Sequence, residues 1–110
     1  MDKQIKRADW PAFADQFSQD NQGRPIGVEI ASQALGDERM AEKVPLVAID
    51  FDHQGRGTFL ITLGQGEATM THTILAPETV WVRNDPDGKA LALEIVAADQ
   101  IVVILRFEDA

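Results

Sequence analysis

Three short segments carry the side chains in this sequence that are best suited to chemistry. His72 lies in the run Thr69–Ile74, and imidazole is the side chain that titrates nearest to neutral pH. Asp50 and Asp52 alternate along another segment, so both carboxylates would share one strand face and offer oxygen ligands to a hard cation. These residues define an enzymatic alternative, a small-ligand or metal-assisted reaction that uses His72 with Asp50 and Asp52.

Both features also have ordinary structural explanations. His72 has the same strand parity as Met70 and Ile74, which favours a buried histidine that hydrogen-bonds to a neighbour. The pattern places no serine, cysteine or carboxylate beside His72, and no loop supplies further regularly spaced oxygen ligands for a metal. The sequence therefore predicts no catalytic residue, no metal site and no cofactor.

The third segment is suited to binding. Trp81 and Arg83 alternate on one predicted strand, and Arg106 lies on the last one. Tryptophan combines a large apolar area with one N–H donor, which makes it frequent at interface hot spots. We expect these three residues, with Thr71 and Thr73 from a neighbouring strand, to form a shallow patch for a partner or small ligand. The sequence leaves open the alternative that the sheet curls and Trp81 fills a second small core.

One amphipathic helix precedes these segments and spans residues 10–20. Asp9 is placed to cap its N-terminus, Pro11 fits its first turn, and Gly23 ends it. Its apolar stripe has helical spacing and consists of Trp10, Phe13, Ala14 and Phe17. An aromatic stripe of this kind is typical of core packing.

Short segments of alternating apolar and polar residues follow the helix, separated by turn signals such as Gln54-Gly55. The predicted strands are Ile26–Ala34, Leu46–Asp52, Thr58–Leu63, Ala68–Leu75, Thr79–Arg83, Lys89–Ala97 and Ile101–Phe107. The charged stretch 36–45 interrupts this rhythm and predicts either a short helical turn capped by Asp37 or a mobile loop. The pattern as a whole favours an antiparallel meander.

The alternation also predicts which side chains face one another. Pairing successive strands so that apolar residues meet gives one apolar sheet face, against which the helix can pack. The opposite face then carries a row across four strands, formed by Thr73, Trp81, Ala92 and Arg106. That face is more apolar than an exposed sheet surface usually is, which indicates partial cover by a partner, by the charged stretch or by a curled sheet.

Composition narrows the remaining possibilities. The length of 110 residues fits one domain over residues 1–110, and a net charge of −8 opposes binding to nucleic acid or anionic membranes. No apolar run approaches the length of a membrane span, the N-terminus lacks the apolar core of a signal peptide, and there are no cysteines. These features predict a cytoplasmic protein that binds neither nucleic acid nor membrane.

Several loose motifs together resemble a family of small bacterial proteins. They are Trp10-Pro11-Ala12-Phe13 with Phe17, the segment Pro45–Ile49, His72-Thr73-Ile74 followed by Pro77, and Leu93–Ile95 with Leu105–Phe107. The pattern covers nearly the whole chain and resembles the family catalogued as domain of unknown function 5335. The resemblance implies a compact single domain of bacterial, cytoplasmic origin and carries over no catalytic residue.

The sequence thus predicts an α+β domain. Its N-terminal helix packs on an antiparallel β-meander of six to seven strands that can curl into a partial barrel. The favoured function is non-enzymatic and consists of binding a protein partner, or of self-association, through the sheet face around Trp81.

Overall fold

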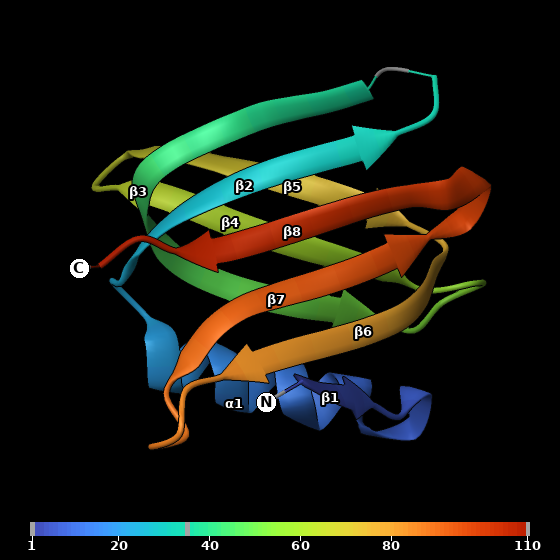
Figure 1. The fold of residues 1–110 in the computed structure, drawn as a ribbon, viewed down its shortest axis with the longest axis horizontal. Coiled ribbons are helices and arrows are strands. Elements are labelled where there is room, and N and C mark those ends of the chain that lie inside the picture. The colour runs from blue at the N-terminus through green and yellow to red at the C-terminus, as the bar shows by residue number, and fades with distance from the viewer. Residues whose placement is uncertain (1, 35, 110) are drawn as a thin grey trace.

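The computed structural model describes residues 2–34 and 36–109, most of which lie in strands (Figure 1). One α-helix, α1 (Trp10–Asn21), follows a 3-10 turn at Arg7–Asp9. The strands are β1 (Asp2–Ile5), β2 (Pro25–Ser32), β3 (Gly36–Asp52), β4 (Thr58–Gln65), β5 (Ala68–Leu75), β6 (Pro77–Asn84), β7 (Ala90–Ala97) and β8 (Ile101–Phe107). They form an eight-stranded antiparallel sheet in the order β1-β6-β7-β8-β2-β3-β4-β5. The α+β class is confirmed, with more strands than predicted.

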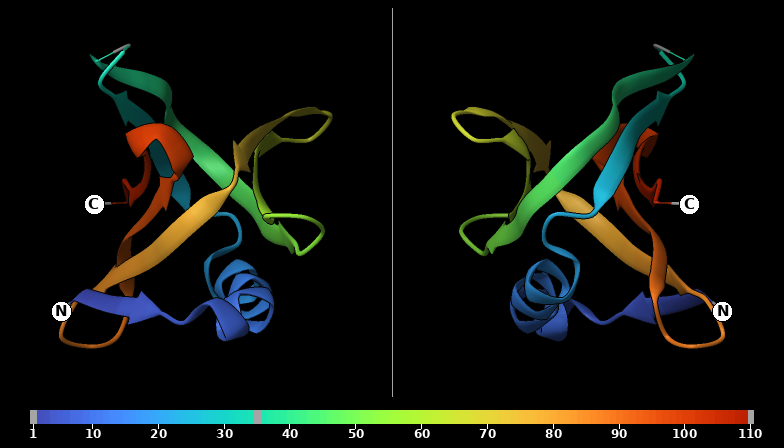
Figure 2. Two further views of the ribbon diagram at one scale, coloured as in Figure 1. Left: turned by 90° about the vertical axis from the view of Figure 1, so that its right-hand side faces the viewer. Right: turned by 90° about the vertical axis from the view of Figure 1, so that its left-hand side faces the viewer.

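The sheet folds over on itself and forms two layers (Figures 1 and 2). The front layer of Figure 1 contains β1, β6, β7, β8, β2 and the first half of β3, while the back layer contains the second half of β3 with β4 and β5. The long strand β3 connects the layers because it pairs with β2 up to Pro45 and with β4 from Leu46 onward. The sheet stays open, and β1 and β5 are its two ends.

The core lies between the two layers and beneath α1. Alternate strand residues point inward, and those that are fully buried include Ile49, Phe59, Ile61, Val80, Leu93, Ile95 and Leu105. The helix closes one opening between the layers (Figure 2), where Trp10, Ala14 and Phe17 are at most 5% exposed. The helical stripe therefore packs in the core as predicted, except that Phe13 at its margin is only half-buried.

The start of α1 differs from the prediction. Asp9 precedes the helix, but its side chain makes no capping hydrogen bond. The 3-10 turn leads directly into the helix, so the Asp9 backbone is already helical (φ −95°, ψ −3°), whereas a capping residue is normally extended. The Asp9 N–H donates instead to the carbonyl of Lys6 at 2.8 Å. A backbone turn, and not a side-chain cap, therefore begins the helix.

The charged stretch 36–45 is also different from the prediction, since it is neither a helical turn nor a loop. It is the first half of β3 and pairs with β2 along most of that strand. Arg39 on this segment lies 4.0 Å from Glu29 and 3.7 Å from Glu42, and it also forms an ion pair with Glu108. Backbone pairing and these ion pairs together overcome the low strand propensity of charged residues.

Candidate functional site

The predicted binding residues are divided between the two layers of the sheet. The outer surface of the front layer carries three of them, Trp81 and Arg83 on β6 and Arg106 on β8. Thr71 and Thr73 lie on β5 in the back layer, at the opposite end of the strand order from β6. The chain crosses between the layers at Ala76, which has a left-handed backbone (φ 51°), so β5 and β6 do not pair (Figure 2). The predicted row that joined Thr73 to Trp81 is therefore wrong.

The register between β6 and β7 also changes the neighbours of Trp81. Trp81 faces Glu94 across the strands, while Arg83 faces Ala92, which in turn faces Arg106. The predicted register between β6 and β7 is wrong by two residues, and a β-bulge lies where β6 approaches its turn. The pairing of β7 with β8 is as predicted. As a result, the small side chain of Ala92 lies between two guanidinium groups.

The outward side chains of β6, β7 and β8 enclose a shallow hollow, which we call the Trp81 face. It is lined chiefly by Trp81, Arg83, Ala92, Glu94, Ile104 and Arg106. Its volume is about 140 Å³, whereas pockets for cofactors and drug-sized ligands occupy roughly 300–1,000 Å³. The hollow therefore fits one side chain of a partner better than a whole small molecule.

Each arginine of the Trp81 face is held by a carboxylate that the sequence did not point to. Arg83 Nε donates to Asp2 Oδ1 at 2.8 Å, and Arg106 Nε lies 3.5 Å from Glu29 Oε1. The hydrogen bond with Arg83 lowers the pKa of Asp2 and raises the pKa of Arg83. The Arg83 and Arg106 side chains remain 61% and 52% exposed. The two carboxylates therefore orient both guanidinium groups. Each guanidinium group still has N–H donors that are exposed to solvent.

Sequence reasoning missed both carboxylates for physical reasons. Asp2 lies on β1, a strand of four residues that is too short and too polar to show an alternating apolar pattern. Glu29 lies on a predicted strand, but it approaches Arg106 only because β2 pairs with β8, which is distant in the chain. Local patterns contain no signal for such a pairing, so neither residue could have been found without the structure.

The structure does not bring together the residues of the enzymatic alternative. His72 pairs with Ile61 on the inner side of the back layer and is half-buried, without a hydrogen-bond partner among the described residues. Asp50 and Asp52 are exposed on the other side, since adjacent strand residues point to opposite faces. Residues 2–34 and 36–109 contain no group of three or more His, Cys, Asp or Glu that could hold a metal ion.

The burial of His72 predicts a dependence of stability on pH. Burial lowers the pKa of His72 below its ordinary value of 6.5, so the folded protein favours the neutral ring. The contribution of this neutral ring is complete above about pH 6.5 and is lost as the pH falls through the lower folded pKa, because the unfolded chain then binds a proton more readily. When the pH is lowered from about 7.5 to about 5, the free energy of unfolding should therefore fall less in His72→Gln than in the wild-type protein.

The measurement is the urea midpoint of unfolding at both pH values. His53→Gln, which changes an exposed histidine at the turn after β3, is the matched control. Carboxylates that titrate over the same range are shared by all three proteins, so they cancel in the comparison. An equal pH dependence in wild type and His72→Gln would contradict the prediction.

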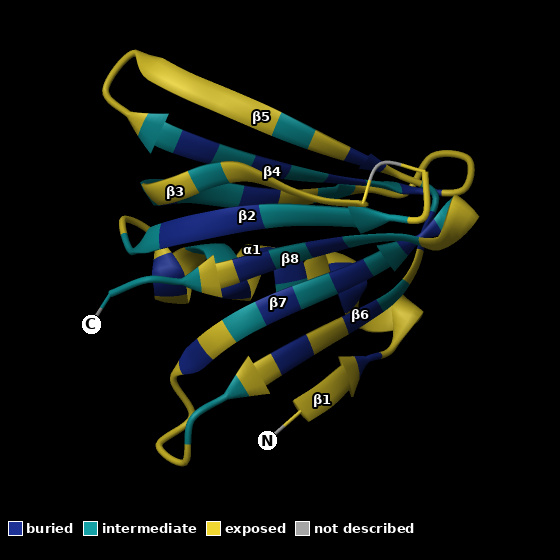
Figure 3. Cartoon of the chain, turned by 45° about the horizontal axis from the view of Figure 1, so that its top comes forward, coloured by how far each residue is buried: buried dark blue, intermediate teal, exposed yellow. Residues whose placement is uncertain are grey.

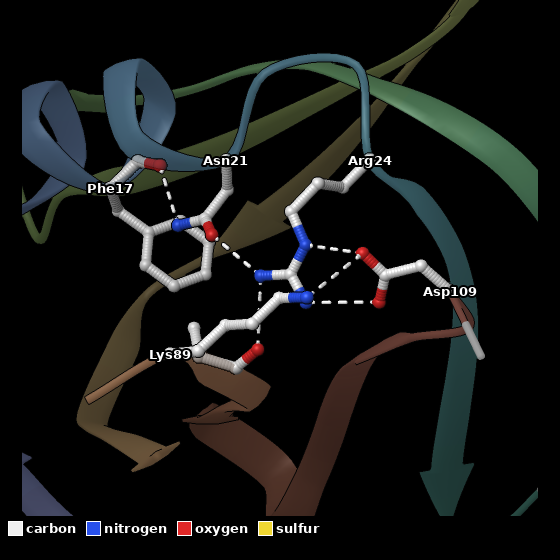
Figure 4. Close-up of polar contacts among 6 residues, drawn as sticks. Phe17, Asn21, Arg24, Lys89 and Asp109 are labelled. Atoms are coloured by element: carbon white, nitrogen blue, oxygen red, sulfur yellow. Dashed lines mark hydrogen bonds and ion pairs between the residues drawn. The ribbon is translucent and has the colours of Figure 1, made fainter. Parts of the chain in front are cut away.

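A second polar cluster, centred on Arg24, was not foreseen (Figure 4). Arg24 Nε and Nη2 donate to the Asp109 carboxylate at 2.7 and 3.0 Å, and Nη1 donates to Asn21 Oδ1 at 2.7 Å. The guanidinium also lies 3.8 Å from the centre of the Phe107 ring. The hydrogen bond from Arg24 lowers the pKa of Asp109. Since the Arg24 side chain is only 15% exposed, this cluster chiefly fastens the end of α1 to the C-terminal segment. Asn21, Arg24 and Ala90 also line part of a wide, open hollow of about 500 Å³ beside the helix.

The comparisons with known proteins identify a family. No curated protein and no solved structure matches the chain. Among the described residues, no helix has the length and apolar character needed to cross a membrane. The model of a family of unknown function, DUF5335, matches residues 1–110, and this confirms the resemblance seen in the motifs. The chain therefore belongs to the DUF5335 family.

Proposed function

We propose that this protein is a non-enzymatic binding module that docks a protein partner on the Trp81 face. The observation that carries the proposal is an exposed tryptophan beside two arginines that flank a small residue. Trp81 keeps 37% of its surface exposed although it lies in the middle of β6, and Arg83 and Arg106 lie on either side of Ala92. Tryptophan and arginine are the residue types most enriched at interface hot spots.

The chemistry of this face suits a segment that presents a carboxylate beside an apolar side chain. Arg83 and Arg106 lie one strand to each side of Ala92, so their backbones are separated by about 10 Å. A carboxylate that enters above Ala92 accepts hydrogen bonds from both guanidinium groups, and its apolar neighbour covers Trp81 and Ile104. Asp2 and Glu29 already pair with these arginines and compete with an incoming carboxylate. Added salt should weaken the binding, because it screens the attraction between exposed charges.

A second copy of the chain is the other occupant that the sequence left open. The chain has a net charge of −8, and carboxylates of Asp2, Glu29 and Glu94 lie on or beside the Trp81 face. Two copies that met face to face would bring these acidic groups together, at a cost in electrostatic repulsion. The charge distribution therefore favours a different protein as the partner on this face.

The proposal predicts that Trp81→Gln abolishes partner capture. Tagged wild-type protein is used as bait in a lysate of its source organism, and the retained proteins are quantified by mass spectrometry. Loss of a hot-spot tryptophan should reduce retention of the specific partner by about 30-fold. Glutamine is used because a new carboxylate would repel Glu94, which faces Trp81. Retention of the same proteins at the same yield by Trp81→Gln would show that the proposal is wrong.

Two comparisons make this experiment specific. Met40→Gln changes a methionine on β3 that is 42% exposed and lies outside the Trp81 face, so this variant should capture the partner as wild type does. Arg83→Gln combined with Arg106→Gln should also lose the partner if a carboxylate is recognised. Far-ultraviolet circular dichroism confirms that each bait is folded.

A further inference from the structure

The unpaired strand edges of the described sheet are not equally protected. Open edges run along β1, the first half of β3 and β5. The β2-facing edge of the second half of β3 is covered by α1, where the Ile49 N–H donates to Ser18 Oγ at 2.7 Å. β1 has only four residues and includes Asp2 and Lys3. The open part of β3 is rich in charge and contains Asp37, Glu38, Arg39, Glu42 and Lys43. Short length and charge are the features that keep sheet edges from pairing with another chain, and β5 has neither.

β5 instead has the properties of a pairing edge. It spans eight residues, ATMTHTIL, and contains no aspartate, glutamate, lysine or arginine. Figure 3 shows it exposed along most of its length at the margin of the sheet. Met70 and Leu75 on this strand are 48% and 69% exposed. Threonine and isoleucine favour the extended backbone, so the strand is suited to accept another strand.

The hydrogen-bond alternation identifies the backbone groups that face the open edge. The Ala76 N–H donates to the carbonyl of Gly57 at 3.2 Å, which continues the β4–β5 ladder, and a two-residue turn joins Gln65 to Ala68. Only every second residue of an antiparallel strand bonds to a given neighbour, so the even-numbered residues of β5 bond to β4. The N–H and C=O groups that point to the open edge belong to Thr69, Thr71, Thr73 and Leu75.

We propose that two copies of this chain pair antiparallel through β5, with His72 of one copy opposite His72 of the other. In this register, Thr69 of each copy lies opposite Leu75 of the other, and Thr71 of each copy lies opposite Thr73 of the other. All four residues whose backbone groups point to the open edge therefore find a partner. The resulting ladder holds about eight hydrogen bonds. The same register places the exposed Met70 opposite Ile74 of the other copy, so that inner-face apolar side chains meet. The sheets of the two copies then form one continuous sheet through the paired β5 strands.

Symmetry favours a second copy as the occupant, and the lack of acidic, lysine and arginine side chains makes β5 the edge where the net charge opposes such a contact least. Each copy carries a net charge of −8, so two copies repel one another over most of their surfaces. Of the open edges named above, β5 is the one that has no acidic, lysine or arginine side chain. Two copies can therefore bring these strands together without placing such charges opposite one another. Self-pairing also satisfies two-fold symmetry, since each strand supplies the same groups to the other. Added salt should strengthen this association, whereas it should weaken partner binding at the Trp81 face.

Single-cysteine variants test the register, because the natural chain has no cysteine. His72→Cys places two thiols at a non-hydrogen-bonded pair on the two-fold axis, where Cα atoms are about 4.5 Å apart and a disulfide can form. Thr71→Cys and Thr73→Cys are matched controls, because each single cysteine then lies diagonally from its copy at more than about 7 Å. Under mild oxidation, the disulfide dimer of His72→Cys should exceed that of either control by about tenfold. Equal cross-linking at the three positions would overturn the proposal.

Wild-type protein provides a second test that does not depend on a cysteine. Its solution mass should be twice 12.1 kDa, and the amides of Thr69, Thr71, Thr73 and Leu75 should exchange hydrogen slowly only in the dimer. Thr73→Lys should return the mass to 12.1 kDa, while Thr79→Lys, the same change on β6, should leave the dimer intact. Trp81→Gln should also remain dimeric, which separates this proposal from the proposed function. A wild-type mass of 12.1 kDa at every concentration, or protection of these amides only by another protein, would overturn it.

Discussion

Replacing Trp10 by alanine should lower the free energy of unfolding by about 4 kcal/mol, a large share of the total for a domain of this size. Trp10 is 1% exposed, and its ring packs against Phe51 and Phe59 with ring centres 5.4 Å apart in each case. Its indole N–H also donates to the carbonyl of Ile5 at 3.0 Å. Alanine would leave a cavity between α1 and the back layer and would remove the donor to that carbonyl.

Urea unfolding followed by far-ultraviolet circular dichroism measures this loss without relying on tryptophan fluorescence. Trp10→Phe keeps an aromatic ring but removes the N–H donor, so it should cost about half as much as alanine. The contact with Ile5 also matters for the candidate site, because Ile5 ends β1 and Asp2 on the same strand holds Arg83. A loss of less than about 1 kcal/mol in Trp10→Ala would contradict the assignment of Trp10 to the core.

The inner face of the sheet could be predicted from the sequence because it depends on local alternation. The rule that apolar residues of successive strands meet holds for Leu93 with Leu105 and for Ile95 with Val103, and all four side chains are buried. Apolar residues at every second position must point to one side of a strand, and burial of that side stabilises the fold. The helix was predicted for the same reason, since the spacing of Trp10 and Phe17 specifies one buried face.

Two strand segments could not be predicted because their stability comes from distant partners. β1 consists mainly of exposed polar residues and forms because it pairs with β6, where Arg83 lies opposite Asp2. The first half of β3 is highly charged and forms because it pairs with β2 and because Arg39 contacts Glu29 and Glu108. Neither segment has the apolar alternation on which a local prediction depends.

The strand order also lay beyond local reasoning. A meander places consecutive strands side by side, which holds for β6, β7 and β8 but fails between β5 and β6. There the Ala76 N–H donates to Gly57 while its carbonyl accepts from the N–H of Ala98, so this residue is bonded to both layers. A single non-glycine residue with positive φ gives no distinctive sequence signal. The separation of Thr73 from Trp81 follows from this one crossing.

The crossing at Ala76 gives the protein two distinct outer surfaces. The Trp81 face lies on the front layer, and the edge of β5 lies at the end of the back layer. Because the two surfaces do not share residues, occupation of one leaves the backbone groups of the other accessible. A β5-paired dimer would therefore carry two Trp81 faces and could bind its partner bivalently, which raises the effective affinity for a partner with repeated binding segments.

Replacing Arg24 by methionine should lower the free energy of unfolding by about 3 kcal/mol. Methionine keeps much of the side-chain length but leaves the Asp109 carboxylate without the two hydrogen bonds that it accepts from Arg24 at 2.7 and 3.0 Å. It also leaves the Ala90 carbonyl without the donor that lies 3.0 Å from it. These acceptors are partly buried between the end of α1, the start of β7 and the C-terminal segment, so water replaces the guanidinium incompletely.

Arg83→Met is the matched control, because it makes the same exchange in an ion pair whose side chains are 61% and 53% exposed. Loss of an exposed pair should cost less than about 1 kcal/mol. Without Arg24, the Asp109 carboxylate keeps only the longer ion pair with Lys89, at 3.8 Å. Urea unfolding of both variants, and of Arg24→Met combined with Asp109→Asn, separates the cost of this weakly compensated carboxylate from the loss of packing on Phe107. The double variant should recover part of the loss, since asparagine carries no charge that needs a partner. Equal losses in Arg24→Met and Arg83→Met would show that burial of the Arg24 cluster contributes nothing to the stability of this fold.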